Sequence, residues 1–502
     1  MTRIGTLLAA AVLAAALGPV PAAAQFETVE AFELKGAQNL IIVPENWNGS
    51  LFIYAHGYSA DQRIIAPFPT DITPANFGTK LPTLFAATAL PALFGYASAT
   101  TTFRSVGWYV EDAIKDIENL RRYFVKKYGK PKYSYIWGHS GGGMVTATIA
   151  EVMPRTYDGA MPLCGPGAGG RRNFNAAFDL RVVFEHVCGG VPGAQFLCRV
   201  CSGGGRCLAD GDCPAGETCG GPEEPPPPED GLTRECTDFL LAHPDRFSED
   251  ALAPGGSFVV PPLTACFGDL TDATPPTPEQ AARRALFLRT TQVAQSFVVS
   301  DMFFASIGMA EVVHRRTRGK HPWGNMGVDY APPALTADER AALNADVYRK
   351  REDAAATEYM RRFYEPRGRT RSKVLTVHAL DDGLVLPENE DKYRQAFEAA
   401  GTADQLVQLY TASGGHCGFI VELFPALNAM TAWVENGTKP SLASMRAACP
   451  TCDFTDALPG PWGLKVVERR QKGVPVRSLV CSGEPGDCPA GNTCVADRHR
   501  CK

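Results

Sequence analysis

Short apolar runs that read as strands alternate with longer amphipathic segments along much of the chain. Turn residues bound these runs, which lie at residues 50–55, 95–103, 132–137, 157–163, 373–379 and 405–410. Between two of them, residues 108–127 place Val110, Ile117 and Phe124 on one helical face and charged side chains on the other. Further helices are expected at 143–153, from about 388 to 400, and at 419–434. Strands that alternate with helices predict a mostly parallel sheet covered on both faces, which is an α/β fold.

The alternation stops after residue 163 and resumes only near residue 373. About 200 residues are too many for a connecting loop, so we expect an inserted region with its own, mainly helical structure. Within it, residues 223–230 are rich in proline and acidic residues and read as a stiff exposed linker. Residues 334–364 read as one helical stretch that begins near Thr336, with Glu339 completing a capping box.

The expected organisation has a leader, a core in two parts, an insertion and a small tail. The boundaries are 1–24 for a signal peptide, 25–165 and 371–440 for the core, 166–370 for the insertion with a cysteine-rich segment at 198–219, and 447–502 for a cysteine-rich tail. Asp-Cys-Pro-Ala-Gly occurs at 212–216 and again at 487–491. These copies are too small for a hydrophobic core, so we expect disulfides to hold them.

The N-terminus has an apolar run from Ile4 to Leu17, followed by Pro-Val-Pro-Ala-Ala-Ala-Gln. This pattern predicts a secretory signal peptide cleaved between Ala24 and Gln25. A membrane anchor is the alternative, but the run is shorter than the ~20 residues of a span, and we expect no later spanning segment. Sixteen cysteines agree with export, because disulfides form in oxidising compartments. We therefore expect a secreted or periplasmic protein.

Other uses of the cysteines and of the surface charge are weaker. Cys198 and Cys201, and likewise Cys449 and Cys452, have zinc-ligand spacing, but neither pair has a histidine or a second pair at metal spacing. Disulfides are favoured, and no metal or organic cofactor is expected. The formal net charge of −5 indicates neither nucleic acid nor an anionic membrane as a partner. A contact of the cysteine-rich units with polymer, cell wall or protein stays open.

The candidate nucleophile is Ser140, within Gly138-His139-Ser140-Gly141-Gly142. An apolar run of strand character precedes this G-x-S-x-G motif, and a small-residue helix follows it, as a nucleophile elbow requires. Glycine on both sides leaves room for the strand and the helix to approach, and the serine takes a strained conformation. The alternative is a glycine-rich turn with an incidental serine.

A serine hydroxyl needs a base, and the base needs an orienting carboxylate. The acid lies in Asp381-Asp382, after the strand expected at 373–379; we favour Asp382, with Asp381 as a solvated neighbour. The base is His416, in a Gly-Gly-His turn after the last core strand. His139 would point away from the serine and His378 would be a core residue.

Two further histidines, His314 and His321, flank a basic segment that reads as solvated surface. The oxyanion donors would be the amides of Gly141 and Tyr58. Tyr58 follows His56-Gly57 at the end of a strand, where an ordinary turn is the alternative.

The elbow, the His56-Gly57 turn, the Asp382 loop and the Gly415-His416 loop resemble the α/β-hydrolase superfamily. The resemblance covers residues 40–165 and 370–437 and implies the order serine, aspartate, histidine. It also implies that the insertion is a cap over the active site.

One feature is similar to tannase and feruloyl-esterase relatives: Cys417 directly follows the histidine. In those relatives this cysteine is bonded to one just before the serine, but His139 stands there in this chain. Cys417 is therefore expected to pair elsewhere, for example with a cap cysteine, or to stay reduced and buried.

These residues predict a secreted serine hydrolase that cleaves small-molecule or polymer carboxylic esters through an acyl-enzyme. Two alternatives remain. One is an exported serine peptidase or aminopeptidase of the same fold, and the other is a non-catalytic surface protein that uses the fold for binding.

Overall fold

The computed structural model describes residues 26–59, 68, 71–76, 87–222, 232–243, 258–332, 334–412, 414–457, 469–471, 494–495 and 500–501. The expected signal peptide at 1–24, the expected linker at 223–230 and the second copy of the cysteine motif at 487–491 lie outside these residues. The chain divides into two compact units. Unit 1 comprises residues 1–168 and 366–460, and unit 2 comprises residues 169–365 and 461–502.

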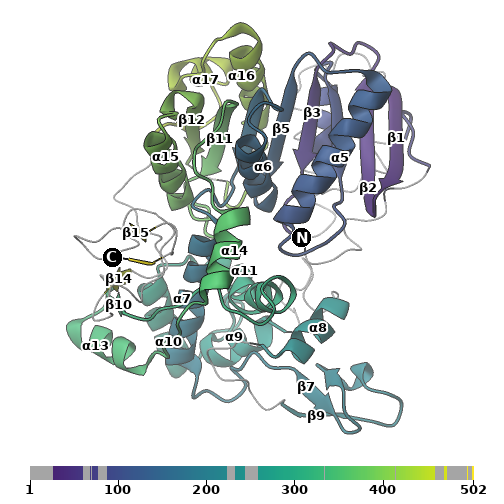
Figure 1. The fold of residues 1–502 in the computed structure, drawn as a ribbon. Coiled ribbons are helices and arrows are strands. Elements are labelled where there is room, and N and C mark those ends of the chain that lie inside the picture. Colours follow the sequence, from purple (N-terminus) through teal and green to yellow (C-terminus); the bar gives the residue numbers. More distant parts are fainter. Residues whose placement is uncertain are drawn as a thin grey trace. The chain divides into compact units, whose positions relative to one another are not determined.

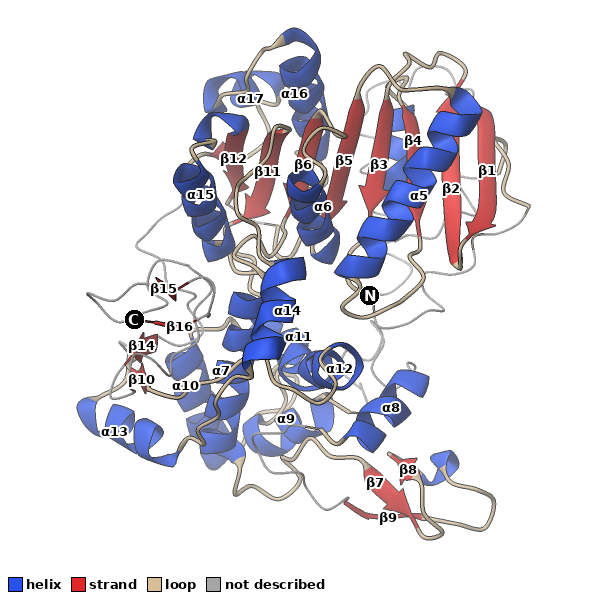
Figure 2. Cartoon of the chain, in the orientation of Figure 1, coloured by secondary structure: helices blue, strands red, loops and turns tan. Residues whose placement is uncertain are grey.

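Unit 1 is built on a nine-stranded sheet, and Figures 1 and 2 show its strands side by side. In spatial order its strands are β1 (Phe26–Leu34), β2 (Ala37–Pro44), β4 (Ala97–Thr101), β3 (Leu51–Ala55), β5 (Ser134–His139), β6 (Gly159–Leu163), β11 (Lys373–Ala379), β12 (Leu406–Thr411) and β13 (Phe454–Thr455). The strands from β4 to β12 are parallel to one another, and β1, β2 and β13 add to the two ends of this run in antiparallel pairs. The predicted mostly parallel α/β sheet is therefore confirmed.

Helices cover both faces of this sheet. They are α4 (Ala89–Ala92), α5 (Val110–Tyr128), α6 (Gly141–Val152), α15 (Glu388–Ala400), α16 (Leu423–Asn436) and α17 (Leu442–Ala448). Helices α5, α6 and α15 lie in front of the sheet in Figure 2. The other face has a core in which Val377 of β11 packs with Met430 of α16. Because side chains alternate along a strand, His378 of β11 points to the α15 face.

Unit 2 is mainly helical. Its helices are α7 (Gly170–Cys188), α8 (Arg234–Ala242), α9 (Val260–Phe267), α10 (Pro278–Thr291), α11 (Val298–Phe303), α12 (Met309–Glu311), α13 (Ala337–Asp346) and α14 (Ala354–Tyr364). Helix α7 contacts α10, α11, α13 and α14 and is the centre of the unit. A two-stranded sheet pairs β10 (Val328–Tyr330) with β14 (Arg469–Gln471), and β15 (Cys494–Val495) pairs with β16 (Arg500–Cys501).

Several local predictions need correction. Residues 26–44 form the hairpin of β1 and β2, which the pattern did not reveal. The helical stretch expected at 334–364 is two helices, although the capping box between Thr336 and Glu339 is present. His321 is buried beside Trp323 rather than solvated.

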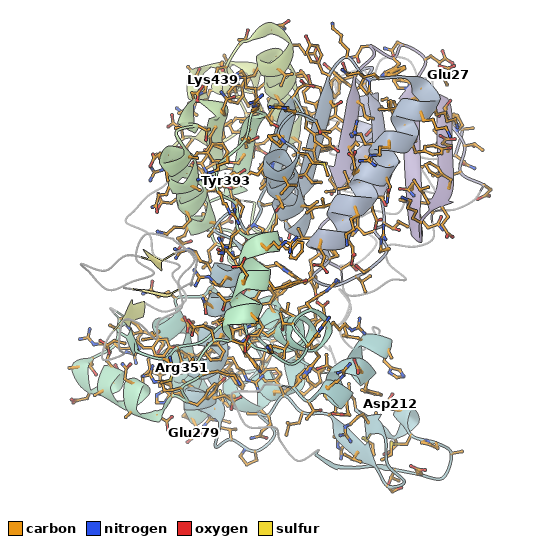
Figure 3. All side chains as sticks on the ribbon, in the orientation of Figure 1. Glu27, Asp212, Glu279, Arg351, Tyr393 and Lys439 are labelled. Atoms are coloured by element: carbon orange, nitrogen blue, oxygen red, sulfur yellow. A yellow bond between two sulfur atoms is a disulfide. The ribbon has the colours of Figure 1, made fainter. Side chains whose placement is uncertain are left out.

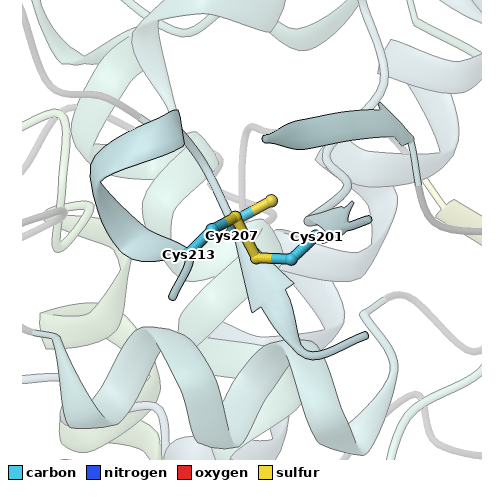
Figure 4. Close-up of side chains that lie close together, drawn as sticks. All are labelled: Cys201, Cys207 and Cys213. Atoms are coloured by element: carbon cyan, nitrogen blue, oxygen red, sulfur yellow. A yellow bond between two sulfur atoms is a disulfide. The ribbon is translucent and has the colours of Figure 1, made fainter. Parts of the chain in front are cut away.

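The cysteine-rich segment folds as a small sheet of β7 (Arg199–Cys201), β8 (Arg206–Cys207) and β9 (Cys219–Pro222). Figure 3 marks its position by Asp212. The sulfur atoms of Cys201, Cys207 and Cys213 lie within 4.8 Å of one another (Figure 4). Each of them is in a disulfide, Cys201 with Cys213 and Cys207 with Cys219. None of the three therefore offers the thiolate that zinc would need.

Of the cysteine pairs considered for zinc, Cys449 and Cys452 are bonded to each other, and Cys198 is bonded to Cys236. A further disulfide joins Cys188 and Cys266.

One helical run, Gln295–Arg316, is long and apolar enough to cross a membrane, contrary to the expectation that no segment after the leader would pass this test. It contains two π-helical stretches, η7 (Phe304–Gly308) and η8 (Val312–Arg316). Within the protein, 72% of its apolar window is buried, as in the core helix of a folded domain. The run is therefore no evidence for a membrane span.

Candidate active site

Ser140 stands at the turn between β5 and α6, with φ 57° and ψ −122°. Neighbouring glycines allow this turn because the main chain packs too closely for side chains. A Cβ on Gly142 would lie 2.0 Å from the carbonyl oxygen of Ala55, and one on Gly138 would lie 2.4 Å from the same oxygen. The close packing of the strand and the helix thus holds Ser140 in this strained conformation.

His416 lies in the loop after β12 and contacts both other candidates. Its Nε2 is 2.9 Å from Ser140 Oγ, and its Nδ1 is 2.8 Å from Asp382 Oδ2. The carboxylate can only accept, so Nδ1 carries the proton and Nε2 is left to accept from the serine hydroxyl. This is the arrangement that general-base activation of a serine requires.

Asp382 is buried, and the structure shows what holds it in place. Its Oδ1 accepts from the amides of Leu384 at 3.0 Å and Val385 at 2.9 Å. Its Oδ2 faces His416 and lies 3.2 Å from His378 Nε2. Three hydrogen bonds and the neighbouring His378 ring therefore hold this carboxylate in place.

Asp381 has a different environment. It is exposed, as expected for a solvated neighbour, but its Oδ1 also accepts from the amide of Gly415 at 2.8 Å. Asp381 thus fastens the backbone of the loop that carries His416, and its side chain does not contact the imidazole.

The two amides expected to bind an oxyanion come from segments in close contact. A Cβ built on Gly141 would lie 3.1 Å from Tyr58 N and 3.0 Å from Tyr109 Oη. Tyr109 donates its hydroxyl to the carbonyl of His56 at 2.8 Å and so supports the turn that leads to Tyr58. Tyr58 N therefore lies close to Gly141, the residue that follows Ser140.

Burial and neighbours separate the histidines of unit 1 into two groups. Burial, and to a lesser extent the nearby His416, lowers the pKa of His139 to about 4, and burial lowers that of His56 to about 4 despite its hydrogen bonds to Gly57 and Thr102. Both rings are neutral at ordinary pH, so neither competes with His416 as a charged group. His139 packs among aromatic rings, including Phe419.

His378 behaves in the opposite way. Burial would lower its pKa, but hydrogen bonds to Asp382 and Glu390 outweigh burial and raise the pKa to about 10. Burial would likewise raise the pKa of Asp382, but hydrogen bonds from His378 and then His416 hold it below its usual value.

A disulfide between Cys164 and Cys417 ties the histidine loop to the sheet. Cys164 follows β6, the strand next to the elbow strand β5, and belongs to unit 1 rather than to the insertion. Both half-cystines have positive φ, 42° for Cys164 and 61° for Cys417. Cys417 therefore has a disulfide partner other than residue 139, which was one of the expected outcomes. That partner is a cysteine of the core and not of the cap.

Sequence reasoning missed two buried groups of this site. It treated His378 as an ordinary core residue and did not consider Glu390 of α15, which lies 3.2 Å from the His378 ring. The available signal was the spacing of four residues between His378 and Asp382 at the end of one strand.

Three features decide the fold: the strand order, the elbow between β5 and α6, and the positions of Asp382 after β11 and His416 after β12. Unit 1 has the α/β-hydrolase fold. Residues 36–185, most of which belong to unit 1, match the model of a tannase-like family of unknown function. This stretch includes Ser140 and Tyr58 and ends before Asp382 and His416. No curated protein matches the chain.

Solved α/β-hydrolases resemble the chain only distantly. Feruloyl esterase B from Aspergillus oryzae has a TM-score of 0.37 and 14% identity, over 81% of this chain and 80% of that one. The rice cell wall degrading esterase LipA from Xanthomonas oryzae has 0.35 and 11%, over 85% and 95%. An acylaminoacyl peptidase from Pyrococcus horikoshii has 0.36 and 9%, over 82% and 42%.

Proposed function

We propose that the protein is a serine hydrolase that cleaves carboxylic esters through an acyl-enzyme. Ser140 is the nucleophile, His416 the general base and acid, and Asp382 the orienting carboxylate. The observation that supports this proposal is the continuous chain of hydrogen bonds from Ser140 Oγ through His416 to Asp382, at 2.9 and 2.8 Å. It starts from a strained elbow serine.

In the proposed reaction, Ser140 Oγ attacks the ester carbonyl carbon while His416 Nε2 takes the hydroxyl proton. The amides of Gly141 and Tyr58 donate to the oxyanion that forms. The intermediate collapses with transfer of the proton from His416 to the departing alkoxide, which leaves as an alcohol. A water molecule then repeats the sequence and releases the acid, restoring Ser140. This scheme calls for no metal or organic cofactor.

The six disulfides among the residues that the structure describes fit a protein that works in an oxidising compartment, outside the cytoplasm. We therefore propose a secreted or periplasmic enzyme acting on small-molecule or polymer esters. The roles of the insertion as a cap and of the cysteine-rich units as contact sites stay predictions.

The decisive experiment is fluorophosphonate labelling with peptide mapping, run beside a panel of p-nitrophenyl esters and aminoacyl amides. We expect the label on Ser140, turnover of esters, and loss of both in Ser140→Ala. Ser134→Ala, at the start of the same strand β5, is the matched control and should keep both activities. Turnover of amides alone would favour the peptidase alternative, and absence of label would favour a binding protein.

A further inference from the structure

The buried chain of polar groups does not stop at Asp382. From Asp382 Oδ2 it continues 3.2 Å to His378 Nε2, and from His378 Nδ1 a further 3.2 Å to Glu390 Oε1. Glu390 Oε2 accepts from Thr376 Oγ1 at 2.7 Å and from Gln408 Nε2 at 2.6 Å. The His378 side chain is fully buried and that of Glu390 is 2% exposed, so water does not replace these contacts.

The partners of the His378 ring determine its protonation. Nε2 lies 2.7 Å from the carbonyl oxygen of Val385, which can only accept, so Nε2 carries a proton. Nδ1 faces a carboxylate oxygen of Glu390, so a second proton must lie between these two atoms. Imidazole is more basic than a carboxylate, which puts that proton on the ring. The ring is therefore an imidazolium between two carboxylates.

We propose that His378 is a positioning residue of the candidate active site, an imidazolium that joins Glu390 to Asp382 and fixes the carboxylate on which His416 depends. This inference rests on the function proposed above. It extends the chain of polar contacts to five side chains, in the order Ser140, His416, Asp382, His378 and Glu390, with an ion-pair contact of 3.2 Å between Asp382 and His378. The raised pKa of His378 and the lowered pKa of Asp382 support the same assignment.

The charge on His378 acts on Asp382. His378 Nε2 lies 3.2 Å from Asp382 Oδ2, the oxygen that His416 Nδ1 faces at 2.8 Å. The imidazolium therefore favours the anionic form of the carboxylate that orients His416.

Three further titratable groups of the described residues that interact with this chain are neutral. They are His139, which interacts with His416, and Tyr393 and Tyr410, which interact with Glu390. Burial lowers the pKa of His139 to about 4, and burial raises the pKa of both tyrosines far above its ordinary value. Figure 3 labels Tyr393 on α15.

The first test measures the rate of fluorophosphonate labelling of Ser140 as a function of pH, which needs no known substrate. In His378→Gln we expect the alkaline limb near pH 10, where His378 loses its proton, to disappear and the plateau rate to fall about tenfold. Val377→Ala, the next residue on β11 but facing the other core, is the matched control. It should lower thermal stability and leave the alkaline limb unchanged. A His378→Gln profile with the wild-type alkaline limb would overturn the inference.

The second test starts from the wild-type protein, so it does not depend on whether a His378 variant folds. With ¹⁵N-labelled histidine, the wild-type protein at about pH 8 should show one imidazole with both nitrogens protonated, where an ordinary histidine is neutral. Glu390→Gln should make that ring lose its second proton at lower pH. A spectrum without a doubly protonated ring refutes the inference. An unlabelled Ser140 in wild type refutes the proposed function instead, and the spectrum still decides the state of His378.

Discussion

Replacing Asp382 by asparagine tests the proposed base most directly, because the structure dictates how the new amide must lie. Oδ1 accepts from the amides of Leu384 and Val385, so the asparagine carbonyl must take that position. Its NH₂ group then takes the position of Oδ2, 2.8 Å from His416 Nδ1. A donor there forces the His416 proton onto Nε2, facing Ser140, and the ring can no longer accept from the hydroxyl.

The expected loss is large because the geometry survives while the tautomer is wrong. Comparable substitutions in serine hydrolases of this type lower kcat by about 10⁴-fold, or about 5.5 kcal/mol of transition-state stabilisation. The assay is kcat for a short p-nitrophenyl ester, with circular dichroism to show that the fold is intact. An Asp382→Asn variant within about tenfold of wild type would refute the assignment.

Asp381→Asn is the matched control, one residue away and equally conservative. Its amide oxygen can still accept from Gly415, so only the extra strength of a charged acceptor is lost. That difference is about 1 kcal/mol, or about fivefold in rate at most. A larger loss for Asp381→Asn than for Asp382→Asn would exchange the roles of the two carboxylates.

Three further outcomes are expected. Replacing Cys164 and Cys417 together by serine opens a crosslink between residues 253 positions apart, so urea unfolding should show a loss of about 2–5 kcal/mol. Gly142→Ala places a Cβ 2.0 Å from a main-chain oxygen and should abolish soluble, folded protein, whereas Gly190→Ala, with nothing within 4 Å, should express normally. The pKa of His378 is raised to about 10 in the folded state, so the stability it contributes is present below its ordinary value of 6.5 and lost as pH rises through about 10. The melting temperature of the wild-type protein should fall as the pH rises across this range, and that of His378→Gln should change less.

The sequence predicted those parts of unit 1 whose cause is local. The elbow is an example, because glycines at 138 and 142 are demanded by contacts that any strand–turn–helix of this kind makes. The buried runs at 51–55 and 373–379 are continuous and apolar, and both are strands of the sheet. The catalytic roles of Ser140, Asp382 and His416 remain predictions until the variants are assayed.

The missed features depend on long-range partners. In β1, the charged residues Glu27, Glu30 and Glu33 interrupt the apolar pattern, and the strand exists because β2 pairs with it. The bond between Cys164 and Cys417 joins positions that only the closed sheet brings together. A histidine inside a strand looks the same in sequence whether or not its ring meets an acid. Only the short spacing to Asp382 pointed to a partner of His378, and nothing in the sequence pointed to Glu390.

The crosslink beside the imidazole also has a practical side. Purification buffers often contain dithiothreitol or a phosphine, and recombinant expression is often carried out in a reducing cytosol. Either treatment would free the segment that carries residue 416 from its anchor after β6. A preparation that fails to turn over a candidate compound is therefore informative only once mass spectrometry of the unreduced digest has found the linked peptide pair.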